Sequence, residues 1–214
     1  MSESENIGVV LSRKEREKQI RQQHILDTAR ELFIRKGYHQ TTLEEIARQA
    51  EFGKGTLYNY FRSKEDLFSG IIDRLADEMF ERTQTALAAP GDVREKMTAY
   101  AKAFISHAQA NSDLFRLIIQ ELHQAKSPQY KAKLKSLNNR TQASLELIAR
   151  LIEGEIGARK IRPFDPLKLV ALFDGMLRWY CINVLENHLH LPLDDIDTTV
   201  DFIVSVFFDG VTEK

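Results

Sequence analysis

Apolar residues recur at intervals of three and four along almost the whole chain, and this spacing constrains the fold more than any other feature. An α-helix has about 3.6 residues per turn, so such an interval gives each helix one apolar face. Strand-like alternation bounded by turn dipeptides is absent. The 5 prolines and 10 glycines fall mostly where a helix would begin or end. We therefore predict an all-α protein of about nine helices.

The N-terminal part predicts three helices joined by short loops. A capping box at Ser12 begins the first helix, and Gly37 ends it. Thr41 and Thr42, each followed three residues later by glutamate, predict two overlapping capping boxes for a second helix. A short third helix begins at Gly53. The residues expected to face inward are Ile25, Leu26, Ala29, Leu32, Phe33, Leu43, Ile46, Ala47, Ala50, Leu57 and Phe61.

The rest of the chain predicts six longer helices. Ser63 with Asp66 caps the fourth, whose inward residues are Leu67, Phe68, Ile71, Ile72 and Leu75. Pro, Gly, Asn, Ser and Asp punctuate the sequence after that point. The remaining helices are expected over residues 92–109, 112–124, 128–156, 166–189 and 195–211.

Charge is unevenly distributed along a nearly neutral chain. The net charge is −1, but residues 13–64 hold 12 basic and 7 acidic residues. A basic segment attached to an acidic body indicates a polyanion partner at the N-terminal end.

Three further features bear on the compartment. Residues 1–12 look like a flexible tail and lack the basic and apolar regions of a secretory signal. The longest apolar runs fall far short of the roughly 20 residues that a membrane span needs. A single cysteine, Cys181, suits a reducing compartment. We expect a cytoplasmic protein without a membrane partner.

Residues 41–61 predict a helix-turn-helix unit, with the helix-turn-helix proper over 41–60. Its second helix is short enough to enter a DNA major groove. Leu57 and Phe61 share one face and anchor it from behind, which leaves Lys54, Gly55 and Thr56 facing outward. The alternative is an ordinary packed corner with half-buried tyrosine rings.

The candidate DNA contacts divide by chemistry, because phosphate contacts fix register and base contacts give sequence preference. Lys54 and Thr56 are assigned to bases, with Tyr58 or Asn59 beside them. Tyr60, Lys64 and Thr41 or Thr42 are assigned to phosphates. Gly55 has no side chain, so it lets the backbone approach DNA closely.

The segment from Gln19 to Leu75 resembles the N-terminal domain of the tetracycline-repressor (TetR) family. The matching features are IL-x-x-A-x-x-LF from Ile25, Gly37, the Thr-Thr pair, Ile46–Ala47 and KGTLY-x-YF-x-SKE-x-L from Lys54. Two positions depart from the family pattern: Glu51 stands where the turn usually has Gly, and Gly53 where the recognition helix usually has Ser.

The resemblance implies a domain order and a mechanism. It implies a DNA-binding domain over 13–64, a connecting helix over 65–81 and a helical ligand-binding and dimerisation domain over 82–214. The expected function is a transcriptional regulator, a repressor that binds a palindromic operator as a homodimer and leaves it when a small molecule binds. The alternatives are an activator of the same family and a helical adaptor that does not bind DNA.

The C-terminal residues agree with a homodimer independently. The helices expected over 166–189 and 195–211 are apolar nearly all round, so they must be covered on several sides. The candidate ligand residues are Tyr100, Phe104, His107, Phe115, Arg116, Gln120, His123, Trp179 and Asn183. Plain core packing is the alternative for each aromatic. The abundance of apolar candidates favours a hydrophobic or amphipathic ligand. Asp174 and Arg178 form an i, i+4 pair that could also hold a ligand or the dimer register.

A basic run begins the first helix. Arg13, Lys14, Arg16, Lys18 and Arg21 oppose the helix dipole, a cost that DNA phosphates would offset. Glu15 and Glu17 interleave, so a solvated face of mixed charge is the alternative.

An enzyme is disfavoured by the motifs. HExxH, CxxC, GxSxG and a glycine-rich phosphate loop do not occur, and no histidine has a glutamate three residues before it. We expect no catalytic residue, no metal and no cofactor, and we expect Cys181 to be inert core.

Overall fold

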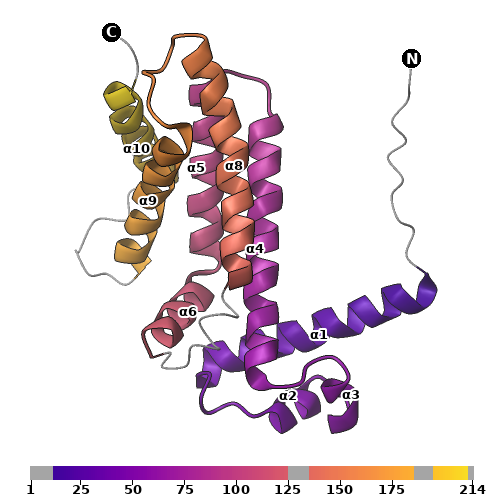
Figure 1. Cartoon of the computed structure of the whole chain (residues 1–214). Helices are drawn as coiled ribbons and strands as arrows, with labels where there is room; N and C mark the ends of the chain where they lie inside the picture. The colour runs from indigo at the N-terminus through magenta and orange to yellow at the C-terminus, as the bar shows by residue number, and fades with distance from the viewer. Residues whose placement is uncertain (1–11, 125–134, 186–194, 212–214) are drawn as a thin grey trace. The chain divides into compact units, whose positions relative to one another are not determined.

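The computed structural model describes residues 12–124, 135–185 and 195–211, which form nine α-helices and no strand (Figure 1). The all-α prediction is confirmed for this part of the chain. The helices are α1 (Arg13–Lys36), α2 (Leu43–Gln49), α3 (Lys54–Tyr58), α4 (Lys64–Ala88), α5 (Val93–Ala110), α6 (Ser112–Gln124), α8 (Lys135–Gly157), α9 (Pro166–Leu185) and α10 (Ile196–Val211). No helix among them is long and apolar enough to cross a membrane.

Helix starts follow the side-chain caps in the sequence. The Ser12 hydroxyl accepts from the Glu15 backbone N–H at 3.3 Å, and the Ser12 N–H donates to the Glu15 carboxylate at 2.8 Å. Asp92 forms the same box with Glu95 at the start of α5. Gly37 ends α1 at φ 89, a backbone conformation that favours glycine. These predicted boundaries are confirmed because caps are local interactions.

Neither of the two capping boxes predicted at α2 is complete, because only the Thr42 hydroxyl caps the helix and the Glu45 carboxylate accepts from Lys36 Nζ instead. Thr42 is the N-cap, and its hydroxyl accepts from the Glu45 N–H at 3.2 Å. Thr41 is buried, and its hydroxyl donates to the Gly37 carbonyl at 2.9 Å. Thr41 therefore closes the loop after α1 and caps nothing.

Several expected boundaries lie outside the described residues. These are the tail over residues 1–11, the start of the helix expected at 128 and the end of the helix expected at 189.

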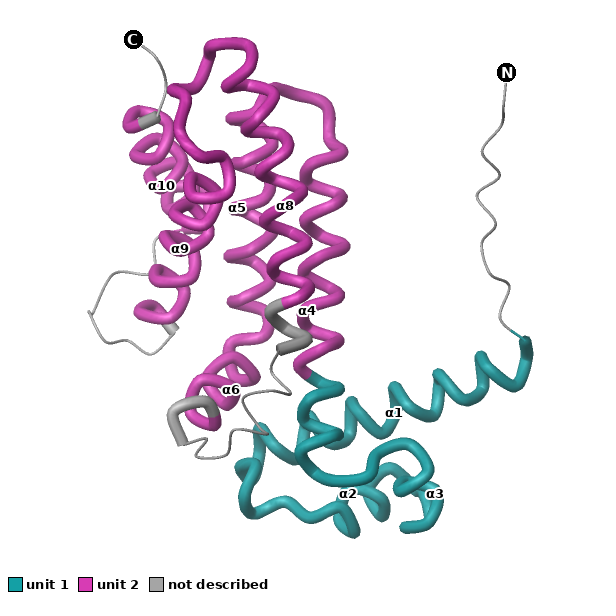
Figure 2. Tube along the Cα trace, in the orientation of Figure 1, with its two compact units in different colours: residues 1–71 teal, residues 72–214 magenta. Residues whose placement is uncertain are grey.

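The chain divides into two compact units between Ile71 and Ile72, within the continuous helix α4 (Figure 2). In unit 1, the core contains the apolar faces of α1, α2, α3 and the first turns of α4. It includes Ile25, Leu26, Ala29, Leu32, Phe33, Ile46, Ala47, Ala50, Leu57, Phe61, Leu67, Phe68 and Ile71, all buried. A Cβ on Gly70 would lie 3.1 Å from Leu26 and 3.2 Å from Phe61, so α4 packs closely here because this residue is glycine.

Unit 2 is a helical bundle in which α5 lies among α8, α9 and α10. Its core is one apolar cluster that includes Met97, Tyr100, Ile105, Ile148, Ile152, Val170, Phe173, Leu177, Val200, Ile203 and Phe207. The cluster leaves one outer face of α9 and α10 uncovered. Its large apolar side chains there are exposed: Leu172, Trp179, Ile182, Phe202 and Val206.

Candidate nucleic-acid interface and ligand cavity

The turn between α2 and α3 forces one residue into a strained conformation. Glu51 has φ 58, and the N–H of the next residue, Phe52, donates back to the Ala47 carbonyl at 2.8 Å. This left-handed conformation costs a non-glycine residue about 1–2 kcal/mol. The turn therefore keeps its geometry with a glutamate in the position that favours glycine.

Helix α3 is anchored on one side and exposed on the other. Leu57 is completely buried and Phe61 is 4% exposed, so both face the core of unit 1 as predicted. The outward residues Lys54, Gly55, Tyr58 and Asn59 are exposed, while Thr56 and Tyr60 are half-buried. A Cβ built on Gly55 meets no atom within 4 Å. The predicted outward orientation is confirmed for Lys54 and Gly55 but not for Thr56, which is half-buried, and the contacts assigned to bases and phosphates stay predictions.

The leading cation of α3 already has a partner. Lys54 Nζ lies 2.5 Å from a carboxylate oxygen of Glu44 in the first turn of α2. A hydrogen bond between the two side chains lowers the pKa of Glu44 and raises the pKa of Lys54. Both side chains are more than half exposed, so the pair can open into water. Sequence reasoning missed Glu44 because the contact crosses the turn.

Lys64 requires a correction. Its ammonium donates to the carbonyl oxygens of Tyr38 at 2.8 Å, His39 at 3.3 Å and Thr41 at 3.0 Å. It also lies 4.5 Å from the centre of the Tyr38 ring. An ammonium has three N–H donors, and these contacts occupy all of them. In this conformation Lys64 fixes the loop between α1 and α2 and has no donor left for phosphate.

Thr41 is corrected for a related reason. Its side chain is 1% exposed and its hydroxyl points at backbone carbonyls, so it cannot present that group to DNA. Of the predicted pair, only Thr42 is exposed at the start of α2.

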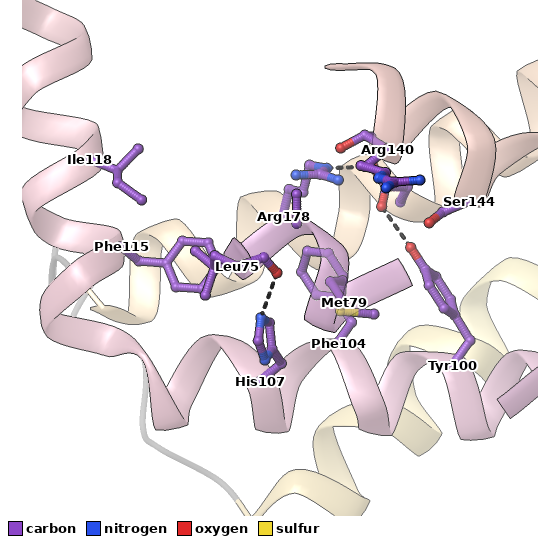
Figure 3. A pocket seen from close by; sticks show the side chains of 13 residues that line it. Leu75, Met79, Tyr100, Phe104, His107, Phe115, Ile118, Arg140, Ser144 and Arg178 are labelled. Carbon is purple, nitrogen blue, oxygen red and sulfur yellow. Dashed lines mark hydrogen bonds and ion pairs between the residues drawn. The ribbon is translucent and has the colours of Figure 1, made fainter. Parts of the chain in front are cut away.

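Unit 2 contains a small cavity of about 80 Å³ between α4, α5, α6, α8 and α9 (Figure 3). Four of the predicted ligand residues line it: Tyr100, Phe104, His107 and Phe115. Asp174 and Arg178, predicted as a pair that could hold a ligand or the dimer register, also line it. Sequence reasoning missed the other lining residues because nothing local marks them: Leu75, Ala76, Met79, Ile118, Arg140, Thr141 and Ser144.

The buried Asp174 carboxylate joins two cavity-lining residues. The Tyr100 hydroxyl donates to one oxygen at 2.8 Å, and Arg178 Nε donates to the other at 2.5 Å. Burial, with the neighbouring Asp174 charge, raises the pKa of Tyr100 well above its ordinary value, so Tyr100 stays a neutral donor. The Arg178 guanidinium also lies 5.3 Å from the centre of the Phe104 ring.

Two other polar side chains of the cavity, His107 and Arg140, are bonded as well. His107 Nε2 lies 3.2 Å from the Leu75 carbonyl, and His107 Nδ1 lies 3.3 Å from the Asn111 amide nitrogen. A carbonyl can only accept and an amide NH₂ can only donate, so these partners fit the neutral imidazole with its proton on Nε2. Arg140 Nε lies 2.5 Å from Asp77 on α4. The cavity is therefore apolar with two paired arginines at its edge.

The remaining predicted ligand residues do not line this cavity. Arg116 and Gln120 are exposed on α6, and Arg116 lies 3.7 Å from Asp113. Trp179 is 56% exposed on the outer face of α9, and Asn183 donates to its backbone carbonyl at 2.7 Å. The side chain of His123 lies outside the described residues.

Neither a reactive thiol nor a cluster of metal ligands is found in the described part of the chain. Burial raises the pKa of the Cys181 thiol to about 12, which disfavours the reactive thiolate. Within the described ranges, no three His, Cys, Asp or Glu residues gather as metal ligands would.

The N-terminal segment matches a known protein family, and most of the chain is similar to a known regulator. Residues 25–71 match the family model described as bacterial regulatory proteins, tetR family. Over 184 residues the chain is 32% identical to the HTH-type transcriptional activator FasR of Mycolicibacterium smegmatis, which spans 85% of this chain and 80% of that protein.

Solved structures share the fold. A putative fatty acid metabolism regulator of Clostridium perfringens aligns with a TM-score of 0.68 and 25% identity, over 89% of this chain and all of that one (100%). The regulator FadR of Bacillus subtilis, solved in complex with stearoyl-CoA, aligns with a TM-score of 0.71 and 20% identity, over 88% and 98% of the two chains.

Proposed function

This chain belongs to the tetR family of bacterial regulatory proteins and is a DNA-binding transcriptional regulator, and from that premise we propose a specific mechanism. A homodimer binds a two-fold symmetric operator as a repressor, and an acyl ligand in the cavity of unit 2 releases the DNA. The observation that carries the proposal is that the N-terminal end of α3 is exposed while Leu57 and Phe61 on its other side are buried in the core of unit 1.

The uncovered face of α9 and α10 supports the homodimer. Leu172, Trp179 and Ile182 follow one another at intervals of seven and three residues along α9, and Phe202 and Val206 stand four apart on α10. These two aromatic and three aliphatic side chains are exposed on two helices that contact each other, and exposed apolar side chains grouped in this way are typical of an interface between protein chains. Gly175 lies between Leu172 and Trp179, and a Cβ there would meet nothing within 4 Å, so a partner helix could approach closely.

The chemistry of the cavity supports an amphipathic anion as the ligand. Leu75, Met79 and Phe115 offer an apolar wall, and Arg140 and Arg178 offer cations at its edge. An acyl chain with an anionic head group fits that combination. The C. perfringens and B. subtilis proteins named above point the same way, through fatty acid metabolism and stearoyl-CoA in their descriptions.

The size of the cavity supports a coupled conformational change. Sites for drug-sized ligands have volumes of about 300–1,000 Å³, well above the volume here. A long acyl chain must therefore enlarge the cavity, and its head group must compete with Asp174 and Asp77 for the two arginines. Such a ligand prefers the enlarged state, and only a ligand with unequal affinity for two states can shift their populations.

The test has two steps. Duplexes are first selected from a random-sequence pool by the protein, with Tyr58→Ala as the control for loss of the DNA surface. The selected duplex is then titrated with stearoyl-CoA, stearate and coenzyme A in separate arms. We expect enrichment of a two-fold symmetric site and release by an acylated ligand but not by coenzyme A. Absence of enrichment would favour the adaptor alternative, and a symmetric site that none of the three ligands releases would contradict the acyl assignment.

Activation is the second candidate, because FasR, 32% identical to this chain, is described as an activator. A reporter gene placed behind the selected site separates the two signs of regulation. Deleting the regulator raises expression if it represses and lowers expression if it activates.

A further inference from the structure

Helix α1 extends well beyond the core of unit 1. Its first buried residue is Ile25, and residues 13–21 are all exposed. We call residues 13–24 the α1 overhang. Twelve helical residues rise about 18 Å, so the overhang is about three turns long. It buries no apolar face, and hydrophobic packing does not explain why it is helical.

The overhang nevertheless has a specified beginning. Ser12 and Glu15 form a complete capping box at its first turn. Short helices without tertiary packing are marginal in water, and a cap shifts them toward the helical state. The sequence therefore favours a helix in a segment whose side chains add nothing to the hydrophobic core.

The acidic residues of the overhang are occupied by their own neighbours. The Glu15 carboxylate accepts from the Ser12 N–H, and Glu17 lies 2.8 Å from Arg13. Lys14, Lys18 and Arg21 form no ion pair with another described residue. In the structure, therefore, both glutamates of the overhang have partners within it, and these three cations are accessible to an external anion.

These three cations also share one face. At 100° per residue, Lys14, Lys18 and Arg21 fall within about 60° of one another, and Ile25 falls inside the same sector. Ile25 is fully buried in the core of unit 1, so the three cations continue the side of α1 that faces the rest of that unit.

The C-terminal end of the overhang, at His24, lies beside the turn that leads into α3. The His24 ring contacts the Phe52 ring edge-on with centroids 5.9 Å apart, and Phe52 directly precedes the N-cap of α3. Arg21 lies one turn before His24. Arg21 therefore lies near the N-terminal end of α3 that is assigned to DNA, and Lys18 and Lys14 extend the same face along α1 away from it.

We propose that Lys14, Lys18 and Arg21 form a second DNA-contact surface, a phosphate clamp that grips the duplex backbone beside the site of α3. The inference rests on DNA binding by α3. Phosphate contacts carry no sequence information, so the clamp adds affinity and lengthens the contacted DNA without changing the preferred bases.

The test measures the salt dependence of binding to two duplexes, one selected by the wild-type protein and one of random sequence. Each phosphate contact contributes about 0.9 to the slope of log K against log salt. We expect the triple variant K14Q/K18Q/R21Q to lose about 2.7 from the slope for each bound protomer, or about 5.4 for the dimer, on both duplexes. The base preference of the selected duplex should be unchanged.

Arg21→Gln and Arg16→Gln form the matched pair, because both remove one arginine from the exposed overhang. Arg16 points about 140° away from Arg21. We expect Arg21→Gln to lower the slope by about 0.9 for each bound protomer, or about 1.8 for the dimer, and Arg16→Gln to leave it unchanged. Equal effects would mean that only net charge matters, and no effect from the triple variant would mean a solvated face. Either result would overturn the clamp, and DNA binding by α3 would still stand as long as the wild-type protein binds the selected duplex. A wild-type protein that binds neither duplex would instead contradict the proposed function.

Discussion

Unit 1 and unit 2 each contain a proposed binding site, and the two sites differ in how far their polar groups are already bonded. On the outward face of α3, Gly55, Tyr58 and Asn59 are exposed. Lys54, which is assigned to bases, forms an ion pair with Glu44 at the surface. In the cavity of unit 2, by contrast, the hydroxyl of Tyr100 and the imidazole of His107 are buried and bonded within the protein.

The difference shows two ways to prepare a site. A surface whose donors are exposed can meet DNA with little rearrangement, so its affinity depends on complementary shape and charge. A cavity whose polar groups are paired must break those pairs to accept a ligand, which ties ligand binding to a change of conformation. The following variants test this contrast, from the largest expected effect to the smallest.

Leu57→Ala removes the anchor behind α3. The side chain is fully buried, so we expect unit 1 to lose about 3–5 kcal/mol and DNA binding to fail with it. Hydrogen exchange measures the effect, with faster exchange confined to unit 1. Tyr58→Ala is the control that should lose DNA binding with an unchanged melting temperature. Wild-type stability of Leu57→Ala would contradict the anchored arrangement.

Asp174→Ala removes the acceptor shared by Tyr100 and Arg178. We expect a loss of about 2 kcal/mol in urea unfolding, because a buried hydroxyl is left without its partner. Asp174→Asn keeps an acceptor for Tyr100 and should lose less. Equal losses for the two variants would show that charge rather than the hydroxyl contact dominates.

Glu51→Gly relieves the strained turn. We expect a gain of about 0.5–1 kcal/mol, the cost of the left-handed conformation reduced by the greater freedom of glycine in the unfolded chain. Glu51→Ala removes the same charge but keeps the Cβ, so it should show no such gain. A gain of the same size in both variants would trace the effect to charge.

Glu44→Gln frees Lys54 from its surface partner. We expect DNA affinity to rise a few-fold at low salt and the rise to shrink at high salt, since exposed charges are screened. Glu31→Gln removes a similar charge from the exposed side of α1 and controls for net charge. A rise of equal size from Glu31→Gln would show that Lys54 was not restrained.

The alkylation rate of the Cys181 thiol measures how well this side chain is buried in unit 2. With a thiol pKa of about 12, alkylation at pH 8 should be slow in the folded protein and fast in denaturant. The folded-state pKa lies above the ordinary value of 9.0. Stability is therefore fully present below that value and falls as the pH rises toward 12, because the unfolded thiol ionises first. Cys181→Ala should remove this dependence. Rapid labelling without denaturant would contradict the packing around α9.

Features that depend on neighbours in the sequence were the predictable ones. Ser12 with Glu15 marks a helix start through contacts three residues apart, and this cap formed as expected. The helix expected from residue 92 also begins there, with Asp92 as its N-cap. The inward position of Leu57 followed from helical spacing alone. In each case the energy that decides the structure lies within one turn of helix.

Features that depend on distant partners were not predictable. Lys64 meets carbonyl oxygens more than 20 residues away, so its basic character alone suggested phosphate. Trp179 sits on a helix that is apolar nearly all round, and periodicity cannot tell which side of such a helix faces the core. Arg140 joined the cavity through the packing of α8, for which the sequence carries no local sign.

The three carbonyl oxygens around Lys64 also bear on chemical footprinting. An acylating reagent must reach the side-chain nitrogen, and the Lys64 nitrogen is part-buried and enclosed by these three carbonyl oxygens. Lys64 should therefore acquire little label whether or not DNA is added, while Lys54 should be labelled in free protein and shielded in the complex. Mass spectrometry of digested samples distinguishes the two lysines, and protection at Lys64 would report the closed loop rather than the operator.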